Sequence, residues 1–415
     1  MEKIPAELYD VIVTQLHDSF CLCGSKNSGR SAWDSARCVS FGWDAQNSKR
    51  LQRELCKLRL VNKKFLGPAT RCLLSHGTLA FDVSFLDGLS ISAQTQYCLA
   101  KENQNIVARV SGLRIDLLLS GFSRHLHLLD LQQPGSHVIT ASRIKEAESA
   151  RGKFLRALPS LGKRFKSVKA LEIRLDGADK RHSRHESKIK SFIRKTLPKL
   201  ESLYLSCDTK DALSIMDKMS ERQCSQLRRL LVHSKSQWAV TWDFTERFQS
   251  LAELEMSLCF QGPLKLHPLN QGLTRLRLAN IWTSEEHLIR VIKQCPARYA
   301  NHSDGGSPLV DLVLRSVNLD AVTDGSTTYE MGTWSEVFRT TRDCCPKLTF
   351  LRVNSVTYDG QVGVFAPQQV LIEEMERERA DIAELQSLIE CVRSRRGRVA
   401  SGLVSSLVGA ITHEF

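Results

Sequence analysis

The chain has 415 residues, 42% of them hydrophobic and 25% charged, and a formal net charge of +13. These proportions are those of globular proteins and exclude a largely disordered chain. The length predicts a small module joined to one large or elongated domain.

The first residues, Met1 to Pro5, lack the basic and apolar regions of a signal peptide, and no apolar run approaches the roughly 20 residues of a membrane span. Thirteen cysteines are scattered from Cys21 to Cys391, several inside apolar runs where a reduced thiol packs as a small hydrophobe. We therefore expect an intracellular protein, cytoplasmic or nuclear, that does not associate with a membrane.

The first apolar stretch has the spacing of an amphipathic helix, with Leu8, Val11, Ile12 and Leu16 on one face. Pro5 falls in the first turn, where a missing backbone N–H costs nothing. Residues 21–50 are rich in Gly, Ser, Asn and Lys, which predicts an exposed insertion.

Apolar periodicity resumes between residues 51 and 65 and predicts two or three short helices. Residues 78–83 then alternate between apolar and polar side chains, as in a strand. The sequence thus predicts a helical module over residues 1–76, followed by a domain that begins with a strand.

A short cassette with leucines two or three residues apart recurs seven times in the second domain, residues 77–365. Helical segments at 284–295 and 334–345 separate some of the cassettes, which predicts strand-plus-helix units whose strands run parallel. The spacing between units overlaps the roughly 20 to 29 residues of leucine-rich repeats and often exceeds it. The equivalent positions are Leu171, Leu203, Leu230, Leu254, Leu276, Leu312 and Leu351.

The predicted fold class is therefore α/β: a helical module, then an irregular solenoid similar to leucine-rich repeats, with a parallel sheet. An ordinary α/β protein is the alternative, because no unit carries the asparagine of the usual repeat. Residues 366–398 predict a long helix that caps the end of the array, with a coiled-coil seam as the alternative. Residues 399–415 form a tail.

Two segments of the N-terminal module carry a resemblance to a known family. Residues 4–12 contain a Pro-Xaa-Glu-Leu helix start, and residues 58–65 read Leu-Arg-Leu-Val-Asn-Lys-Lys-Phe. Together they resemble an F-box of the kind common in fungal proteins. The resemblance implies binding to the Skp adaptor of a cullin-based ubiquitin ligase through Pro5, Leu8, Val11, Ile12, Leu58, Val61, Asn62 and Phe65.

The family resemblance further implies that the second domain binds a protein substrate and that the chain itself is not an enzyme. The alternative for the helical stripes is that they pack on the repeat domain. No phosphate-binding loop, dinucleotide fingerprint or His-Glu-Xaa-Xaa-His motif occurs. Cys21, Cys23 and Cys38 near His17 lack the spacing of ordinary zinc sites, so we expect no metal and no cofactor.

Positive charge is concentrated in residues 151–200, which contain 16 Lys or Arg residues and only four acidic residues. Two interpretations explain this density of charge. The segment is either a solvated helix face or a surface that binds an acidic or phosphorylated protein segment. Nucleic acid is disfavoured because few aromatic residues interleave, although a basic scaffold that binds nucleic acid or acidic partners is the alternative function. The residues concerned are Lys163, Arg164, Lys166, Lys169, Lys180, Arg181, Arg184, Lys188, Lys190, Arg194 and Lys195.

Overall fold

A computed structural model describes most of the chain after residue 94 and shorter pieces before it. The described residues are 8–9, 11–13, 54, 57–58, 60–61, 63–65, 67–69, 78–82, 95–117, 136–175, 188–189, 191–194, 197, 199–238, 247–260, 264–265, 272–293, 306–319, 333–354, 356–358 and 368–397. Predictions for residues 21–50 and 399–415 lie outside this set. The chain forms two compact units, residues 1–203 with 214–219 and residues 204–213 with 220–415.

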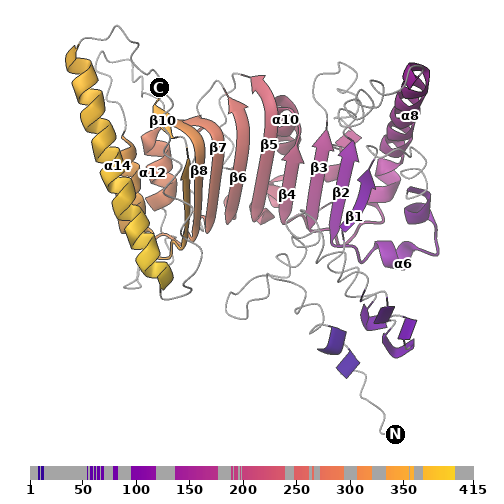
Figure 1. Cartoon of the computed structure of the whole chain (residues 1–415). Coiled ribbons are helices and arrows are strands. Elements are labelled where there is room, and N and C mark those ends of the chain that lie inside the picture. Colours follow the sequence, from indigo (N-terminus) through magenta and orange to yellow (C-terminus); the bar gives the residue numbers. More distant parts are fainter. Residues whose placement is uncertain are drawn as a thin grey trace. The chain divides into compact units, whose positions relative to one another are not determined.

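The first unit contains three parallel strands in sequence order (Figure 1): β1, Thr78–Asp82; β2, Gly112–Leu117; and β3, Ala170–Leu175. A short helix α6, Gln104–Val107, precedes β2, and the long helix α8, Ser136–Gly162, joins β2 to β3. The strand predicted at 78–83 is confirmed. β2 and α8 were not among the predicted elements.

Aromatic side chains from separate elements form the core of the first unit. The ring of Phe81 in β1 lies 4.8 Å from that of Phe154 in α8 and 6.3 Å from that of Phe165, between centroids. All three side chains are at most 1% exposed. Strand residues Leu113 and Leu171 pair directly in register and are equally buried, so the leucines of the cassettes face this core.

The division between the units passes through strand β4, Ser202–Ser206, and helix α10, Thr209–Asp217. The second unit continues with the short helix α11, Glu221–Gln226, whose Ser220 and Gln223 form a reciprocal capping box.

The second unit contains five neighbouring parallel strands (Figure 1): β5, Arg229–Trp238; β6, Glu253–Phe260; β7, Arg275–Thr283; β8, Asp311–Leu319; and β9, Phe350–Asn354. The short strand β10, Thr357–Tyr358, pairs with the end of β8. The register confirms the predicted equivalence of five leucines, because each pairs with the next: Leu230, Leu254, Leu276, Leu312 and Leu351. The predicted α/β class with parallel strands is confirmed.

The strands β3, β4, β6, β7, β8 and β9 begin with the same backbone arrangement. The carbonyl before one strand accepts two consecutive N–H groups at the start of the next, as Ala252 does from Thr274 and Arg275 at 2.8 and 3.2 Å. The same pattern recurs at Ser111, Lys169, Arg228, Thr274 and Val310. The repetition of one local geometry within each unit shows that the cassettes are structurally equivalent there.

In β7 and β8 the alternation of buried and exposed side chains shifts by one residue near the middle of the strand. Asn280 in β7 and Ser316 in β8 have positive φ values of 53° and 49°, a left-handed conformation that costs energy for residues other than glycine. This extra residue lets the following Ile281 and Val317 point back into the core, where both are fully buried.

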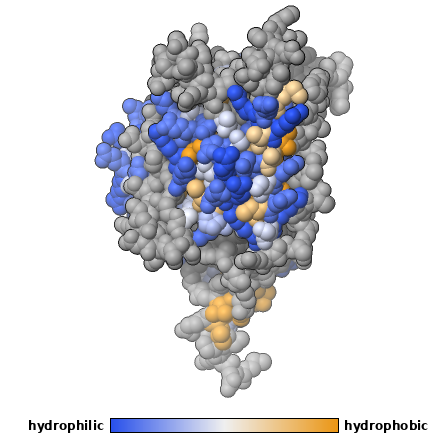
Figure 2. All heavy atoms as spheres, turned by 90° about the vertical axis from the view of Figure 1, so that its left-hand side faces the viewer, coloured by the Kyte–Doolittle hydropathy of each residue, from blue (hydrophilic) through white to orange (hydrophobic). Residues whose placement is uncertain are grey.

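Three helices pack in sequence order in the second unit: α12, Glu285–Lys293; α13, Trp334–Cys344; and α14, Gln368–Gly397. α13 contacts both α12 and α14, and α14 lies at the end of the row of strands (Figure 1). Their bounds agree closely with the predicted helices at 284–295, 334–345 and 366–398. α14 packs on α13 through Leu385, Leu388 and Val392, all at most 9% exposed. Figure 2 shows the side of the molecule on which α14 lies, where the described surface is mainly hydrophilic.

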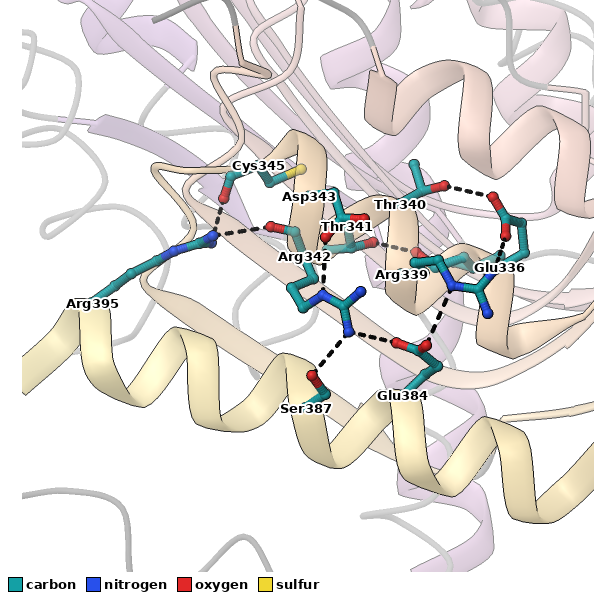
Figure 3. A network of polar contacts seen from close by, with 11 residues as sticks. Glu336, Arg339, Thr340, Thr341, Arg342, Asp343, Cys345, Glu384, Ser387 and Arg395 are labelled. Carbon is teal, nitrogen blue, oxygen red and sulfur yellow. Dashed lines mark hydrogen bonds and ion pairs between the residues drawn. The ribbon is translucent and has the colours of Figure 1, made fainter.

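A polar network also joins α14 to α13 (Figure 3). Arg342 contacts Glu384 at 2.7 Å and Ser387 at 2.9 Å. At the end of α13, Arg395 donates to the carbonyl oxygens of Cys345 and Arg342 at 2.6 and 3.0 Å. A cation at this position complements the negative end of a helix dipole and satisfies carbonyls that lack intrahelical partners.

Candidate functional site

Helical pieces of the N-terminal module share a small buried core. The rings of Tyr9 and Phe65 meet edge to face with 4.7 Å between centroids, and Tyr9 is only 5% exposed. Val13 and Ala69 are 2% and 0% exposed. The two segments that resemble an F-box therefore contact each other, and Phe65 supports the module from within.

Other apolar side chains of the same module point to solvent. They are Leu8, Val11, Ile12, Leu60 and Val61, which we name the N-terminal apolar surface; Leu60 and Val61 are 88% and 73% exposed. The first three are 40% to 47% exposed and share one helix face. Of the remaining predicted adaptor contacts, Leu58 is half-buried, whereas Pro5 and Asn62 lie outside the described residues. Leu60 was not predicted, because it falls between the positions of the periodic stripe.

The strands of the second unit turn a polar face away from the core. Alternate residues of each strand lie on it, since their neighbours are buried leucines and methionines. We name this the strand face, and its residues are Arg229, Leu231 and His233 from β5; Glu253, Glu255 and Ser257 from β6; Arg275, Arg277 and Ala279 from β7; Asp311, Val313 and Arg315 from β8; and Phe350, Arg352 and Asn354 from β9.

Charges of alternating sign run across four strands of this face, and we name them the charge ladder. Glu253 lies between Arg229 at 2.9 Å and Arg275 at 3.1 Å. Arg275 also contacts Asp311 at 3.0 Å. These side chains are 9% to 26% exposed, so burial strengthens their attraction relative to an exposed pair.

Arg277 links the first row of the ladder to the next. It contacts Asp311 at 2.6 Å and Glu255 at 3.8 Å, and Glu255 also lies 3.3 Å from His233. Burial opposes the charge of Arg277, but the hydrogen bond to Asp311 and the nearby carboxylates outweigh it and raise the pKa of its guanidinium. Arg277 therefore stays charged and links β7 to both β6 and β8.

The end of the strand face at β8 and β9 differs from the ladder. Arg315 and Arg352 are exposed, and neither forms an ion pair with an acidic side chain of the described chain. Phe350 is 38% exposed, and the guanidinium of Arg396 from α14 lies 5.4 Å from the centre of its ring. This end of the strand face therefore exposes two arginine side chains and part of an aromatic ring.

The basic segment of the first unit is only partly used within the protein. Lys169 pairs with Glu201 at 2.8 Å, and Arg164 donates to Gln104 at 2.8 Å. The other described members, Lys163, Lys166, Lys188 and Arg194, are exposed. Lys180, Arg181, Arg184, Lys190 and Lys195 lie outside the described residues.

Buried cysteines of the two units are packing residues. Burial raises the pKa of the Cys345 thiol to about 12 and that of Cys98 to about 11. Both thiols are therefore protonated at neutral pH, and a protonated thiol is a poor nucleophile. Within the described ranges, no group of three or more His, Cys, Asp or Glu side chains is arranged to hold a metal ion, and no helix is both long and apolar enough to cross a membrane. The cluster of Cys21, Cys23 and Cys38 lies outside those ranges.

No protein-family model matches the chain, and no curated protein matches it.

Proposed function

We propose that this chain is the substrate-recognition subunit of a Skp-cullin-F-box ubiquitin ligase. The N-terminal helices bind the Skp adaptor, the repeat domain binds a protein substrate, and a separate enzyme transfers ubiquitin. The chain itself supplies no catalytic residue in this scheme.

The N-terminal apolar surface is the observation that carries the adaptor role. Its side chains belong to the two segments that resemble an F-box, and Leu8, Val11, Ile12 and Val61 are four of the residues that the resemblance implies as contacts. Several exposed apolar side chains on one small module are costly in water and are typical of protein-binding surfaces. The contact between Tyr9 and Phe65 supports this proposal, because it holds the two segments together.

We also propose that the strand-plus-helix units form an irregular leucine-rich-repeat solenoid. The aligned leucines of the second unit and the recurring strand-start hydrogen bonds support it. In such arrays the strands line an extended binding surface, which makes the strand face the candidate for substrate binding.

Co-purification of the full chain with the Skp adaptor tests the adaptor role. We expect a stoichiometric complex with the wild type and its loss in a Leu8→Asp, Val61→Asp double variant, since two carboxylates would enter an apolar interface. A Tyr97→Asp, Met375→Asp variant is the matched control, because these side chains are 49% and 54% exposed outside the module. The control variant should bind like the wild type.

Two outcomes would contradict the proposal. One is a folded wild-type chain that forms no complex with the adaptor. The other is equal binding by the wild type and the Leu8→Asp, Val61→Asp variant, which would show that the N-terminal apolar surface is not the contact.

A further inference from the structure

The strand face of the second unit carries two kinds of arginine. Arg229, Arg275 and Arg277 lie within 2.6 to 3.8 Å of the carboxylates of the charge ladder. Arg315 and Arg352 form no such pair with the described part of the chain, although both belong to the same face. An anion from a partner would have to displace a carboxylate of this protein to bind an arginine of the charge ladder. It could bind Arg315 and Arg352 without such a displacement.

The register places these two arginines side by side. Arg352 pairs directly with Val313, and Arg315 lies two residues further along the same strand, so the two arginines are diagonal neighbours on adjacent strands. Parallel strands lie roughly 4.8 Å apart and two residues along a strand span roughly 6.6 Å, so the Cα atoms of diagonal neighbours are separated by roughly 8 Å. Two arginine side chains can converge on one anion from this separation. Leu312, Leu314 and Leu351 are buried on the opposite face, so both arginines point away from the core.

An aromatic ring completes this end of the face. Phe350 precedes Arg352 by two residues on the same face, and Arg396 lies over its ring at 5.4 Å. Arg396 also donates to the backbone carbonyl of Thr349, which anchors the cation beside the ring. Phe350 thus offers a fixed apolar contact next to a pair of cations.

We propose that Arg315 and Arg352 together bind one anionic side chain, a phosphorylated residue or a carboxylate, in a segment of a partner protein. A neighbouring apolar side chain of that segment packs on Phe350. The inference rests on the proposed function as a substrate receptor and names the chemistry that the strand face recognises. Guanidinium groups suit this task because their planar donors bind carboxylate and phosphate oxygens in pairs.

A protein segment fits this end better than a nucleic acid does. Single-stranded nucleic acids bind through successive aromatic side chains, and Phe350 is the one exposed aromatic residue among the described positions of the strand face on β8 and β9. One anion clamp beside one ring matches a single charged residue with an apolar neighbour.

Fluorescence anisotropy with the full chain tests the inference. The probes are labelled degenerate nonapeptide mixtures with a central phosphoserine, glutamate, serine or lysine, together with a labelled oligothymidine. The test variant is Arg315→Gln, Arg352→Gln. The matched control, Arg222→Gln, Arg228→Gln, removes the same charge from exposed positions of the same unit.

We expect the phosphoserine or the glutamate mixture to bind the wild type more tightly than the serine and lysine mixtures do. The test variant should weaken this binding on the order of tenfold or more, because each lost bond joins two charges, and the control should change it less than about twofold. Preference between the two anionic mixtures identifies the source of the anion.

Three results would overturn the inference: no anionic mixture binds, the control weakens binding as much as the test variant, or oligothymidine binds more tightly than the peptides and responds to the same variant. Adaptor co-purification on the same proteins separates the inference from the proposed function. Retained adaptor binding without anion binding refutes the inference alone. Anion binding without adaptor binding refutes the ligase role and supports the anion clamp.

Discussion

The chain carries an apolar helical stripe near each end, and the two stripes are buried to very different degrees. In α14, Leu385, Leu388 and Val392 are at most 9% exposed because they pack on α13. In the N-terminal module, Leu8 and Val11 are 47% and 46% exposed, although their spacing is equally helical. Spacing alone therefore identifies an apolar face without showing whether the protein itself covers it.

Polar complementarity distinguishes the two helices. Asp381 of α14 accepts the backbone N–H of Ser335 at 2.7 Å at the start of α13, and Arg395 donates to the carbonyls at its end. An anion at the beginning and a cation at the end of α13 both complement its dipole. Such matching on both sides of an apolar stripe is a sign of an internal contact, and the N-terminal apolar surface shows no such matching among the residues described.

The largest effect is expected at the buried stripe. Leu388 is fully buried, so Leu388→Ala should lower the free energy of unfolding by about 2–5 kcal/mol through lost apolar contact and a cavity. Chemical denaturation of the full chain measures this change. Met375→Ala on the same helix is the control, because Met375 is 54% exposed and should change stability by less than about 0.5 kcal/mol. Equal effects would show that α14 is not held through this stripe.

A smaller effect is expected at the polar edge of the same contact. Asp381→Ala leaves the buried N–H of Ser335 without its acceptor and should cost about 1–3 kcal/mol. Asp381→Asn keeps an acceptor oxygen and should recover part of the loss, as measured by the same denaturation. An alanine variant as stable as the wild type would show that the bond from Ser335 to Asp381 does not help to hold α14 on α13.

Glu285, at the start of α12, is a second carboxylate at the beginning of α13, and its raised pKa allows a pH-dependent test of its contribution to stability. It accepts the N–H of Thr333 before α13, and burial raises the pKa of its carboxyl above the usual 4.5 although this bond opposes the shift. Because its pKa is raised in the folded state, Glu285 contributes stability that is fully present below pH 4.5 and is lost as the pH rises through the folded-state pKa. Glu285→Gln removes the buried charge and keeps an acceptor. We expect it to be modestly more stable than the wild type at neutral pH, with the difference shrinking toward pH 4.5.

Thermal unfolding of the wild type and Glu285→Gln across this pH range measures the effect. A variant that is less stable than the wild type at every pH would show that the charge itself is needed by α13. That result would strengthen the role of the helix dipole relative to burial.

The smallest change in stability is expected at the N-terminal apolar surface. Leu8→Asp with Val61→Asp should alter the free energy of unfolding by less than about 0.5 kcal/mol, because these side chains are 47% and 73% exposed. Denaturation of this variant beside Leu388→Ala compares the two stripes directly. A loss of several kcal/mol would mean that the N-terminal stripe packs inside the protein, as the alternative interpretation of the sequence holds.

Much of the second unit was predictable because its pattern is local. Leucines two residues apart predict a strand with one buried face, and five of the predicted equivalences are confirmed by direct pairing in register. β2 was missed although Leu113-Arg114-Ile115 has the same pattern, since it stood outside the regular spacing. α8 was missed because polar residues interrupt the apolar periodicity of its first half.

The sequence by itself determined the α/β class, the parallel strands and the positions of the helices α12, α13 and α14, because strand and helix periodicities depend on neighbours within a few residues. Only the tertiary structure decided which charges pair. The partners in the charge ladder are separated by 22 to 36 positions along the chain, so nothing local predicts that Arg275 meets Asp311 while Arg315 meets no acid of the described face. The same holds for the stripes, whose burial depends on a surface contributed by a distant segment.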